Sequence, residues 1–362
     1  MATVLFHLHH LYYLPQFLPV AQAMERDGNF EVFYSTVIDK SRDDYEWTRK
    51  IIGDLGGNFI SADDEKERVG KILEHNFDVV VFGKSNGAEK YCNPSTLAVL
   101  LYHGIGVKAC YYTDFNPRID VRYVESQYRF DELRRRNVQT DLIVTGFPKL
   151  DLLADISAKK DYLEKYKLTP DKSTILYAPT FYPSSIEVFG ETLAGQTYDY
   201  NLVVKLHHFA WLMKKYRHQR RLWQALSRKY EHVRLMPVEE YNIVPLFAFS
   251  DVLLTEASST AFEYLAVERP IIIADFIKLR WKHHLFRGRF ERQRLDSAII
   301  DELNFAYHLE QPQDLLRVLE TALNDTEKKK QLLSQKRNLF LGNMDGKAAE
   351  RVVADLKRRL KI

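Results

Sequence analysis

The chain has 362 residues, of which 46% are hydrophobic and 28% are charged, and its formal net charge at pH 7 is +3. This length exceeds what one hydrophobic core usually serves, so we expect two domains. The near balance of charge excludes a chain that is basic throughout, and we expect no nucleic-acid partner. No stretch approaches the roughly 20 apolar residues that span a bilayer, and the first residues lack a basic leader.

The two cysteines, Cys92 and Cys110, are too few for a disulfide framework or a four-ligand zinc site, so we expect a cytoplasmic protein with reduced thiols.

Short apolar runs alternate with amphipathic segments along the first half of the chain. The pattern predicts strands at 3–8, 30–36, 58–61, 78–83, 107–114 and 141–148. It predicts helices at 15–27, 42–55 and 66–76, and the run STLAVLL at 95–101 is also interpreted as helical. Strands that alternate with helices form parallel sheets covered on both faces.

The alternation restarts after a charged helical stretch and turn at 159–173, which we interpret as a linker. Strands are expected at 173–180, 200–208, 231–237, 250–257 and 269–275, a long loop at 181–199, and helix in the tail from 327 to 362. The pattern predicts an α/β protein with two Rossmann-like, doubly wound parallel-sheet domains facing a central cleft. The expected domains are 1–160, 161–345 and a C-terminal helix, 346–362, that could pack back on the first domain.

Two glycines follow a histidine in the segment His103-Gly104-Ile105-Gly106-Val107-Lys108. Glycine lets the backbone approach a ligand closely or adopt a positive φ. Open α/β sheets bind ligands beyond their strand ends, and imidazole is well matched to removing a hydroxyl proton near neutral pH. His103 is therefore a candidate general base, and a glycine turn with an incidental histidine is the alternative.

Lys205 and His207 stand at the carboxyl end of the strand predicted at 200–208. Side chains at this end of a strand converge on the ligand site of an α/β domain. They could neutralise phosphates through charge-assisted hydrogen bonds. A polar strand terminus without a ligand is the alternative.

The strand predicted at 250–257 leads directly into small polar residues that begin a helix. Ser258, Ser259 and Thr260 would occupy the N-cap and the first turn, where hydroxyl and backbone N–H groups form an anion pocket. Glu263 stands about one turn later and could accept hydrogen bonds from ribose hydroxyls. An ordinary capped helix is the alternative.

Two softer patterns concern a metal and a membrane. His7, His9 and His10 lie near the end of the first predicted strand without a carboxylate or thiol close in sequence, so loop histidines or donors to an acceptor are expected before a metal site. The segment 211–230 carries seven Lys or Arg between aromatic and aliphatic residues, as in helices that lie on anionic membranes, and 280–294 is a second basic cluster. A solvated surface is the alternative for both basic segments. We expect no metal and no cofactor, and the first strand is not followed by a G-x-G-x-x-G motif.

Taken in order, these segments resemble the CDP-glycerol glycerophosphotransferase family of teichoic-acid and capsule synthesis, whose architecture is GT-B. The matching residues, spread over roughly 75–275, are His103-Gly104 with Lys108, the turn Ala178-Pro179-Thr180, Lys205 with His207, Thr255 with Ser258 and Ser259, and the run 145–151. The chain departs from the family pattern at Glu256-Ala257, where Asp-Tyr is usual, at His208, where Pro is usual, and at Gly106-Val107, where Pro-Leu is usual.

The resemblance implies a GT-B-like transferase that moves glycerol phosphate, or a related polyol phosphate, from a CDP-linked donor to a hydroxyl of a glycan or lipid-linked acceptor, with CMP release. His103 would be the general base and His207 would steady the donor pyrophosphate. The residues that bind the substrate or its nucleotide would be Gly104, Lys108, Thr180, Lys205, Thr255, Glu256, Ser258, Ser259, Thr260 and Glu263. The N-terminal domain would serve the acceptor and the C-terminal domain the nucleotide, on the inner face of the cell membrane if 211–230 binds it.

Two other functions fit the same elements. One is a GT-B glycosyltransferase or UDP-N-acetylglucosamine 2-epimerase that uses a UDP- or GDP-sugar. The other is a catalytically silent module that binds a nucleotide or an anionic polymer. The sequence leaves open the donor polyol, the acceptor and the oligomeric state.

Overall fold

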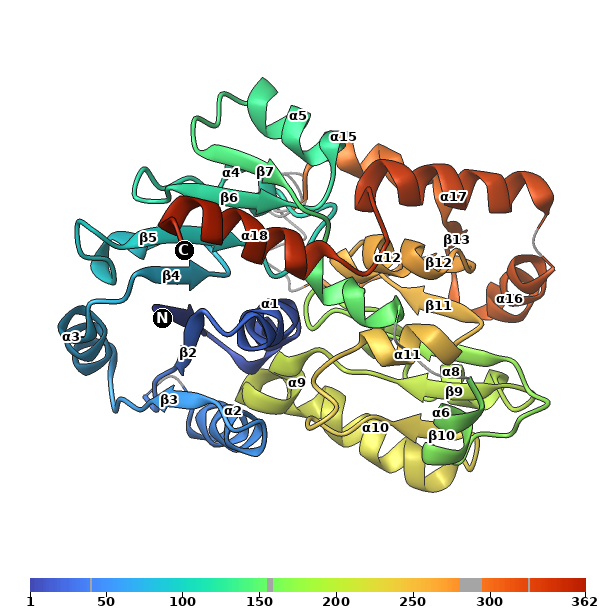
Figure 1. The fold of residues 1–362 in the computed structure, drawn as a ribbon. Helices are drawn as coiled ribbons and strands as arrows, with labels where there is room; N and C mark the ends of the chain where they lie inside the picture. The colour runs from blue at the N-terminus through green and yellow to red at the C-terminus, as the bar shows by residue number, and fades with distance from the viewer. Residues whose placement is uncertain (40, 155–158, 280–294, 325) are drawn as a thin grey trace. The chain divides into compact units, whose positions relative to one another are not determined.

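A computed structural model describes residues 1–39, 41–154, 159–279, 295–324 and 326–362, and the chain divides into two compact units (Figure 1). The N unit comprises Met1–Gly104, Tyr111–Ala154 and Phe340–Ile362. The C unit comprises Ile105–Cys110 and Asp155–Leu339. The chain therefore contributes a short early segment to the C unit and its last helix to the N unit.

The N unit is built on a seven-stranded parallel sheet with the strand order β3-β2-β1-β4-β5-β6-β7. Its strands are β1 (Ala2–His7), β2 (Phe30–Ser35), β3 (Asn58–Ile60), β4 (Val79–Phe82), β5 (Leu97–Leu101), β6 (Val121–Val124) and β7 (Asp141–Val144). In the central register Val4 pairs with Val32 on one side and Val79 on the other, and all three side chains are buried. The strand order reverses between β1 and β4, which is where open α/β sheets form their ligand crevice.

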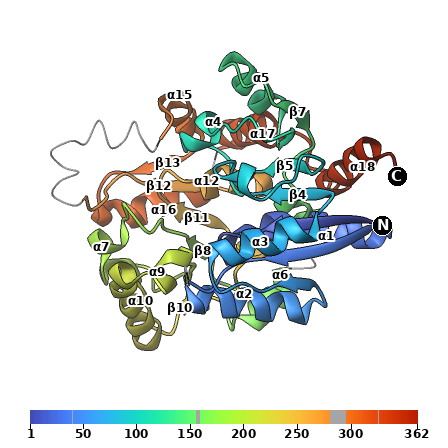
Figure 2. The same cartoon turned by 90° about the vertical axis from the view of Figure 1, so that its left-hand side faces the viewer.

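Helices cover both faces of this sheet. They are α1 (Leu14–Asp27), α2 (Arg42–Asp54), α3 (Glu65–His75), α4 (Cys110–Thr113), α5 (Gln127–Arg135) and α18 (Ala348–Leu360), with 3-10 turns η1 (Leu11–Tyr13), η2 (Ala88–Lys90) and η3 (Pro148–Ala154). Because the chain runs from β1 outward to β3 and then returns to β4, right-handed crossovers place α1 and α2 on one face and α3 on the other (Figure 1). After a quarter turn α3 lies in front of the sheet (Figure 2).

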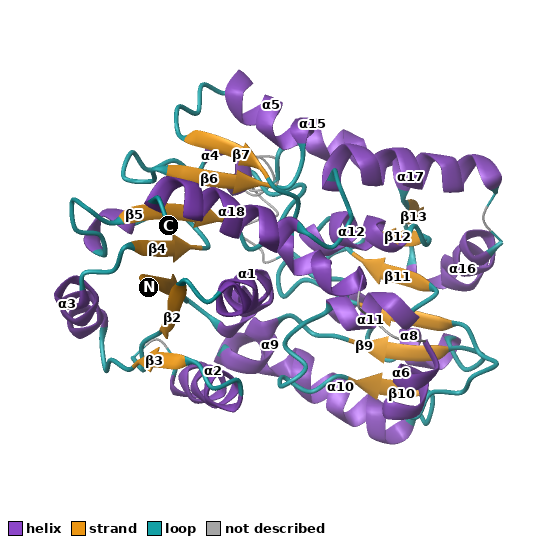
Figure 3. Cartoon of the chain, viewed as in Figure 1, coloured by secondary structure: helices purple, strands orange, loops and turns teal. Residues whose placement is uncertain are grey.

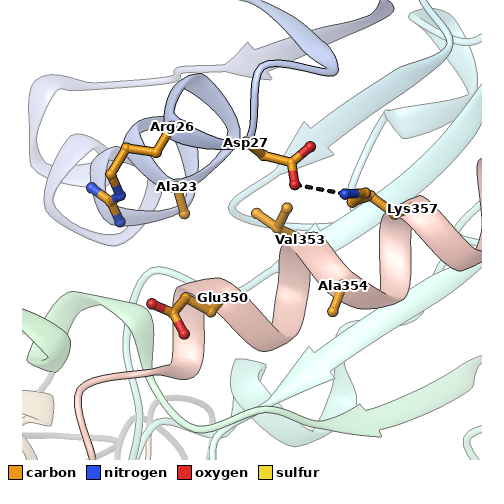
Figure 4. Close-up of a pocket in the computed structure, with 7 residues that line it drawn as sticks. All are labelled: Ala23, Arg26, Asp27, Glu350, Val353, Ala354 and Lys357. Carbon is orange, nitrogen blue, oxygen red and sulfur yellow. Dashed lines mark hydrogen bonds and ion pairs between the residues drawn. The ribbon is translucent and has the colours of Figure 1, made fainter. Parts of the chain in front are cut away.

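The C-terminal helix α18 packs against α1 in the N unit. Its first turn is capped by the Asp151 carboxylate, which accepts hydrogen bonds from the backbone N–H groups of Ala348 at 3.1 Å and Ala349 at 2.7 Å. A pocket between the two helices is lined by Ala23, Arg26, Asp27, Glu350, Val353, Ala354 and Lys357, and the Lys357 ammonium donates to Asp27 at 2.7 Å (Figure 4). None of the predicted site residues lines this pocket.

The C unit is built on a six-stranded parallel sheet with the order β10-β9-β8-β11-β12-β13. Its strands are β8 (Thr174–Tyr177), β9 (Asn201–Val204), β10 (Val233–Leu235), β11 (Val252–Thr255), β12 (Ile271–Ala274) and β13 (Tyr307–Leu309). Figure 3 shows the strands of each sheet side by side with helices packed against them. The order reverses between β8 and β11, so the topology repeats that of the N unit.

The helices of the C unit are short except for α10 and α17. Their bounds are α6 (Lys159–Lys165), α7 (Ile186–Phe189), α8 (Thr192–Gln196), α9 (His208–Leu212), α10 (Arg217–Lys229), α11 (Val244–Phe249), α12 (Ser259–Tyr264), α15 (Ser297–Ile300), α16 (Leu315–Leu323) and α17 (Glu327–Leu341), whose last two residues belong to the N unit. The 3-10 turns are η4 (Lys214–Tyr216), η5 (Leu265–Val267), η6 (Asp301–Phe305) and η7 (Pro312–Asp314). Among the described residues, no helix combines the length and the apolar composition that crossing a membrane requires.

Two doubly wound parallel-sheet domains were predicted, and this architecture is confirmed. Three local predictions were wrong. The segment 181–199, predicted as a long loop, contains the short helices α7 and α8. The run at 95–101, predicted as a helix, contains strand β5, and the segment 107–114, predicted as a strand, contains the short helix α4. A short apolar run of five residues fits either state, and its length favours a strand. Strands β6 and β13 were not predicted, and in β6 the buried Arg122 interrupts the apolar pattern.

Gly106 is required by packing within the C unit. Its φ is +91°, and a Cβ atom at this position would lie 2.3 Å from the Phe262 ring of α12. The glycine therefore lets the segment 105–110 pack directly on α12. Gly104 and Gly106 were both interpreted as glycines that let the backbone approach a ligand. Gly106 is instead needed for packing.

We expect Gly106→Ala to lower the free energy of unfolding by about 3 kcal/mol or more, because it combines a left-handed φ with a clash against a buried ring. Thermal and urea unfolding measure the change. Gly70→Ala is the matched control, since Gly70 lies within α3 with no atom within 4 Å of an added Cβ, and it should be neutral or stabilising. Equal effects of the two substitutions would contradict this account.

Candidate functional site

His103 lies just beyond the carboxyl end of β5, and a backbone hydrogen bond fixes its tautomer. Its Nδ1 atom lies 2.8 Å from the carbonyl oxygen of Gly83, which follows β4. A carbonyl oxygen only accepts hydrogen bonds, so Nδ1 carries the proton of the neutral ring. Nε2 is then the nitrogen that can take up a proton, which is the arrangement a general base requires.

The imidazole of His103 is also held by an aromatic stack. The ring of Tyr13, from η1, lies parallel to it with centroids 4.2 Å apart and planes 11° apart, and the Tyr12 ring meets it edge-on at 5.4 Å. A Cβ atom on Gly83 would lie 2.5 Å from the Tyr13 ring. Gly83 thus admits the tyrosine that stacks on His103 and accepts the hydrogen bond that orients it. Neither Gly83 nor Tyr13 was predicted, although a glycine directly after four buried strand residues was a usable signal.

His7, at the end of β1, and His10, in the loop that follows, have separate partners. The Nε2 atom of His7 lies 2.6 Å from the guanidinium of Arg68, and since arginine only donates, His7 accepts. The Nδ1 atom of His10 lies 2.7 Å from the Asp44 carboxylate, which also accepts from the backbone N–H of Leu11 at 3.1 Å. Among the described residues, no group of three or more His, Cys, Asp or Glu is arranged to hold a metal ion. Asp44 of α2 therefore holds the loop that carries the tyrosines through His10 and Leu11.

Apart from Lys108, the predicted binding residues of the C unit gather at the carboxyl ends of three adjacent strands, β9, β8 and β11. The backbone N–H of Lys205 donates to Tyr177 at 2.9 Å, and that of Ala178 donates to Leu254 at 2.9 Å, so the ladder extends beyond each strand. Thr180, Lys205 with His207, and the segment 255–260 follow these three strands. They share one edge of the sheet at the point where the strand order reverses, as the sequence predicted.

His207 has the opposite tautomer to His103. It is the N-cap of α9, and its Nδ1 atom accepts a hydrogen bond from the backbone N–H of Phe209 at 3.1 Å. The proton of the neutral ring is therefore on Nε2, which makes this nitrogen a hydrogen-bond donor. A donor nitrogen suits a phosphate oxygen, whereas the accepting Nε2 of His103 suits a hydroxyl proton.

The polar run after β11 begins helix α12, as predicted. Ser258 is the N-cap with φ −145° and ψ 166°, and Ser259 and Thr260 form the first turn. The hydroxyl of Ser258, however, lies 3.2 Å from the hydroxyl of Thr255, which donates to the Ala178 carbonyl at 2.7 Å. Glu263 is buried, whereas Ser259 and Thr260 are half-buried. These two are the members of the run that have both exposure and a first-turn position.

Glu256 ties the loop after β8 to the end of β11. One carboxylate oxygen accepts from both the backbone N–H of Ser185 at 2.7 Å and its hydroxyl at 2.5 Å, and the other accepts from the backbone N–H of Thr180 at 2.6 Å. The residue is 4% exposed, and burial raises the pKa of the carboxyl group to about 7 in spite of these hydrogen bonds. Both oxygens of Glu256 are thus used within the protein, and the loop that it holds carries Thr180.

The segment His103–Lys108 is divided between the two units. His103 and Gly104 belong to the N unit, whereas Lys108 belongs to the C unit and forms an isolated antiparallel bridge with Leu295. Gly104 is buried and directly follows His103. The motif that looked continuous in sequence therefore contributes to two folding units.

Three of the four aromatic residues of the basic segment 211–230 are buried, and Trp211 is half-buried. Trp223 is fully buried, and Tyr216 and Tyr230 are 4% and 8% exposed. Trp223 and Tyr230 belong to the core of the C unit because α10 packs its apolar side inward. The basic residues Lys214, Lys215, Arg217, Arg221, Arg228 and Lys229 are exposed, and Lys229 pairs with Glu191. The second basic cluster, 280–294, lies outside the described residues.

We expect Glu256→Gln to flatten the pH dependence of stability between about pH 4.5 and 7. The pKa of Glu256 is higher in the folded than in the unfolded chain, so its contribution is fully present below about pH 4.5 and is lost as the pH rises through 7. The loss is on the order of 3 kcal/mol, from 1.36 kcal/mol per pKa unit. Thermal unfolding across this range measures it. A Glu256→Gln variant that keeps the wild-type slope would contradict the assignment.

The model of the CDP-Glycerol:Poly(glycerophosphate) glycerophosphotransferase family matches residues 118–357, which include every predicted site residue of the C unit except Lys108 and exclude His103. Teichoic acid poly(glycerol phosphate) polymerase of Bacillus spizizenii is 28% identical over 142 residues, 36% of this chain and 34% of that protein. Teichoic acid poly(ribitol-phosphate) polymerase of the same organism is 25% identical over 236 residues, 59% of this chain and 33% of that protein. The matches thus span about a third of the length of these curated relatives.

Solved structures show the same fold at low identity. The wall teichoic acid polymerase TagF has a TM-score of 0.68 and 16% identity, covering 100% of this chain and 90% of that chain. The UDP-GlcNAc 2-epimerase of Neisseria meningitidis bound to UDP-GlcNAc has a TM-score of 0.60 and 13% identity, covering 98% of this chain and 100% of that chain. These likenesses confirm the predicted GT-B-like fold. Because the family model matches more than half of its residues, the chain belongs to the CDP-glycerol:poly(glycerophosphate) glycerophosphotransferase family.

Proposed function

We propose that this protein is a transferase that moves glycerol phosphate, or a related polyol phosphate, from a CDP-linked donor to a hydroxyl group of a glycan or lipid-linked acceptor. The observation that carries this proposal is the family match over residues 118–357, which spans Thr180, Lys205, His207 and the run 255–260. Curated relatives named as poly(glycerol phosphate) and poly(ribitol-phosphate) polymerases support both polyols as candidates. No cofactor is proposed besides the nucleotide-linked donor.

In the proposed reaction the acceptor oxygen attacks the phosphorus that bears the polyol. The P–O bond to the CMP portion breaks and CMP leaves, while the acceptor proton passes to Nε2 of His103. The Nε2–H of His207, with Lys205 and the first turn of α12, would stabilise negative charge on the phosphates. Catalysis of this kind depends on positioning and electrostatics, and the fixed tautomers of both histidines support it.

The division of labour between the domains is also a proposal. Residues 1–160 would bind the acceptor and 161–345 the nucleotide, with 346–362 as a terminal helix. Lys205, His207, Thr180, Ser259 and Thr260 would contact the donor directly. The remaining proposed contacts would be made by Gly104, Lys108, Thr255, Ser258 and Glu263, while Glu256 would act through the loop that it holds.

A second candidate is an enzyme that acts on a UDP- or GDP-sugar, favoured by the fold likeness to a UDP-GlcNAc 2-epimerase. Nucleotides discriminate the two candidates, because a ligand that binds the folded state raises the unfolding temperature. Stabilisation by CMP or CDP-glycerol supports the glycerophosphotransferase. Stabilisation by UDP or GDP alone supports the second candidate.

We expect His103→Ala and His207→Ala each to lower the rate of CMP release from CDP-glycerol by about 100-fold or more, since each removes a positioned proton acceptor or donor. His75→Ala is the matched control, because His75 is exposed on α3 and stacks on Phe77. Release of CMP is measured by chromatography with an acceptor present. Full activity of either variant would refute the role proposed for that histidine.

We propose a cytoplasmic location with electrostatic binding to the inner face of the membrane through exposed basic residues of 211–230. Since Tyr216, Trp223 and Tyr230 are buried, binding would depend chiefly on the exposed charges. We expect Lys214→Gln/Lys215→Gln to weaken sedimentation with anionic liposomes by about 1 kcal/mol per lysine. Lys328→Gln/Lys330→Gln on α17 removes the same charge elsewhere and should have no effect. Binding that resists salt, or that is equal on zwitterionic liposomes, would exclude this mode.

A further inference from the structure

A carboxylate outside the predicted site connects the two loops that orient His103. Asp114 follows α4 and is half-buried. One of its oxygens accepts from the hydroxyl of Ser85 at 2.6 Å, and the other accepts from the backbone N–H of Ser85 at 2.9 Å and the hydroxyl of Tyr102 at 2.5 Å. All these residues belong to the N unit.

The partners of Asp114 stand beside the two ends of the hydrogen bond that fixes His103. Ser85 is two residues after Gly83, whose carbonyl accepts from Nδ1, and Tyr102 directly precedes His103. Ser85 is fully buried, and the neighbouring Asn116 donates to its carbonyl at 3.0 Å, so the loop after β4 is held on both sides. Any change in the spacing of the two loops would alter the Nδ1 to carbonyl distance directly.

The ring of Tyr102 is itself held so that its hydroxyl reaches Asp114. It is 8% exposed, and the guanidinium of Arg122 lies over its face, 5.1 Å from the centroid. Arg122 in turn donates to the backbone carbonyl of Tyr111 at 2.5 Å. The tyrosine hydroxyl is therefore directed by packing, and Asp114 is its acceptor.

We propose that Asp114 is a positioning residue for His103, and that it sets the imidazole tautomer by locking the loop after β4 to the loop after β5. The expected effect of Asp114 on the rate of CMP release rests on the function proposed for His103. Its expected effect on the tautomer does not. Its chemical basis is that an ionised carboxylate accepts every bond and donates none, which matches the three donors that meet here. Asparagine has nearly the same shape but presents an NH₂ group to at least one of these donors.

The test compares Asp114→Asn with Asp120→Asn in the full chain. Asp120 is a matched control because its carboxylate also accepts from a backbone N–H, that of Ala98 at 2.7 Å, and from Arg118 at 2.8 Å. It lies at the amino end of β5, whereas His103 follows the carboxyl end. Histidine ring nitrogens labelled with ¹⁵N report the tautomer by NMR at alkaline pH, and the His103→Ala spectrum assigns the signal.

We expect wild type and Asp120→Asn to show His103 protonated on Nδ1, and Asp114→Asn to show a mixture of both tautomers. The kcat for CMP release should fall about 10- to 100-fold in Asp114→Asn, as expected for a misplaced catalytic group, with KM for CDP-glycerol little changed. Tyr102→Phe removes one of the three bonds and should shift the tautomer in the same direction to a smaller extent. If Asp114→Asn does not fold, the tautomer of His103 in Tyr102→Phe is the deciding measurement.

An unchanged Nδ1–H tautomer in Asp114→Asn, or in Tyr102→Phe where that variant carries the test, overturns the proposal. The same tautomer change in Asp120→Asn also overturns it, because the effect would then be general loosening of the unit. A changed tautomer with full CMP release supports the positioning role and refutes His103 as the general base. The two proposals therefore fail by different measurements.

Discussion

A loop that leaves the carboxyl edge of a parallel sheet has no neighbouring strand to pair with, so its backbone donors need acceptors from elsewhere. In both units of this protein the acceptors are carboxylates. Asp44 and Asp114 hold the loops after β1 and β4, and Glu256 holds the loop after β8. A carboxylate suits this position because its two oxygens accept several hydrogen bonds at once, and an ionised carboxylate has no donor of its own that would need a partner. The chemistry at each sheet edge depends on these anchors, which need not contact any ligand.

The two histidines show how such anchoring assigns chemical roles. Imidazole has one donor and one acceptor nitrogen when neutral, and the neighbour of one nitrogen decides the function of the other. A carbonyl acceptor beside His103 makes its second nitrogen basic, while an N–H donor beside His207 makes its second nitrogen a donor. The two rings could exchange roles only if their backbone surroundings were exchanged. The local fold therefore distinguishes residues that the sequence presents as equivalent.

Sequence reasoning predicted what depends on local pattern. The parallel strands, the N-cap at Ser258 and the polar residues after β9 and β11 follow from apolar runs and capping preferences. It failed where the pattern is ambiguous, as in the five apolar residues of β5, and where tertiary packing overrides it, as for the buried Arg122 in β6. Asp114 could not be found because its partners, Ser85 and Tyr102, become neighbours only through the order of β4 and β5 in the sheet.

Several residues of the sequence motifs contact the protein itself and maintain the fold. Gly106 is needed by the ring of Phe262, Glu256 by the loop at 180–185, and the Ser258 hydroxyl interacts with Thr255. A glutamate has a longer side chain than the aspartate usual in the family, and here that length lets one carboxylate reach both Ser185 and Thr180. The departure at this position therefore need not alter what the site binds, because the substituted group faces the protein. The residues that decide the donor are more reasonably sought among Lys205, His207 and the first turn of α12, whose polar atoms stand at the sheet edge.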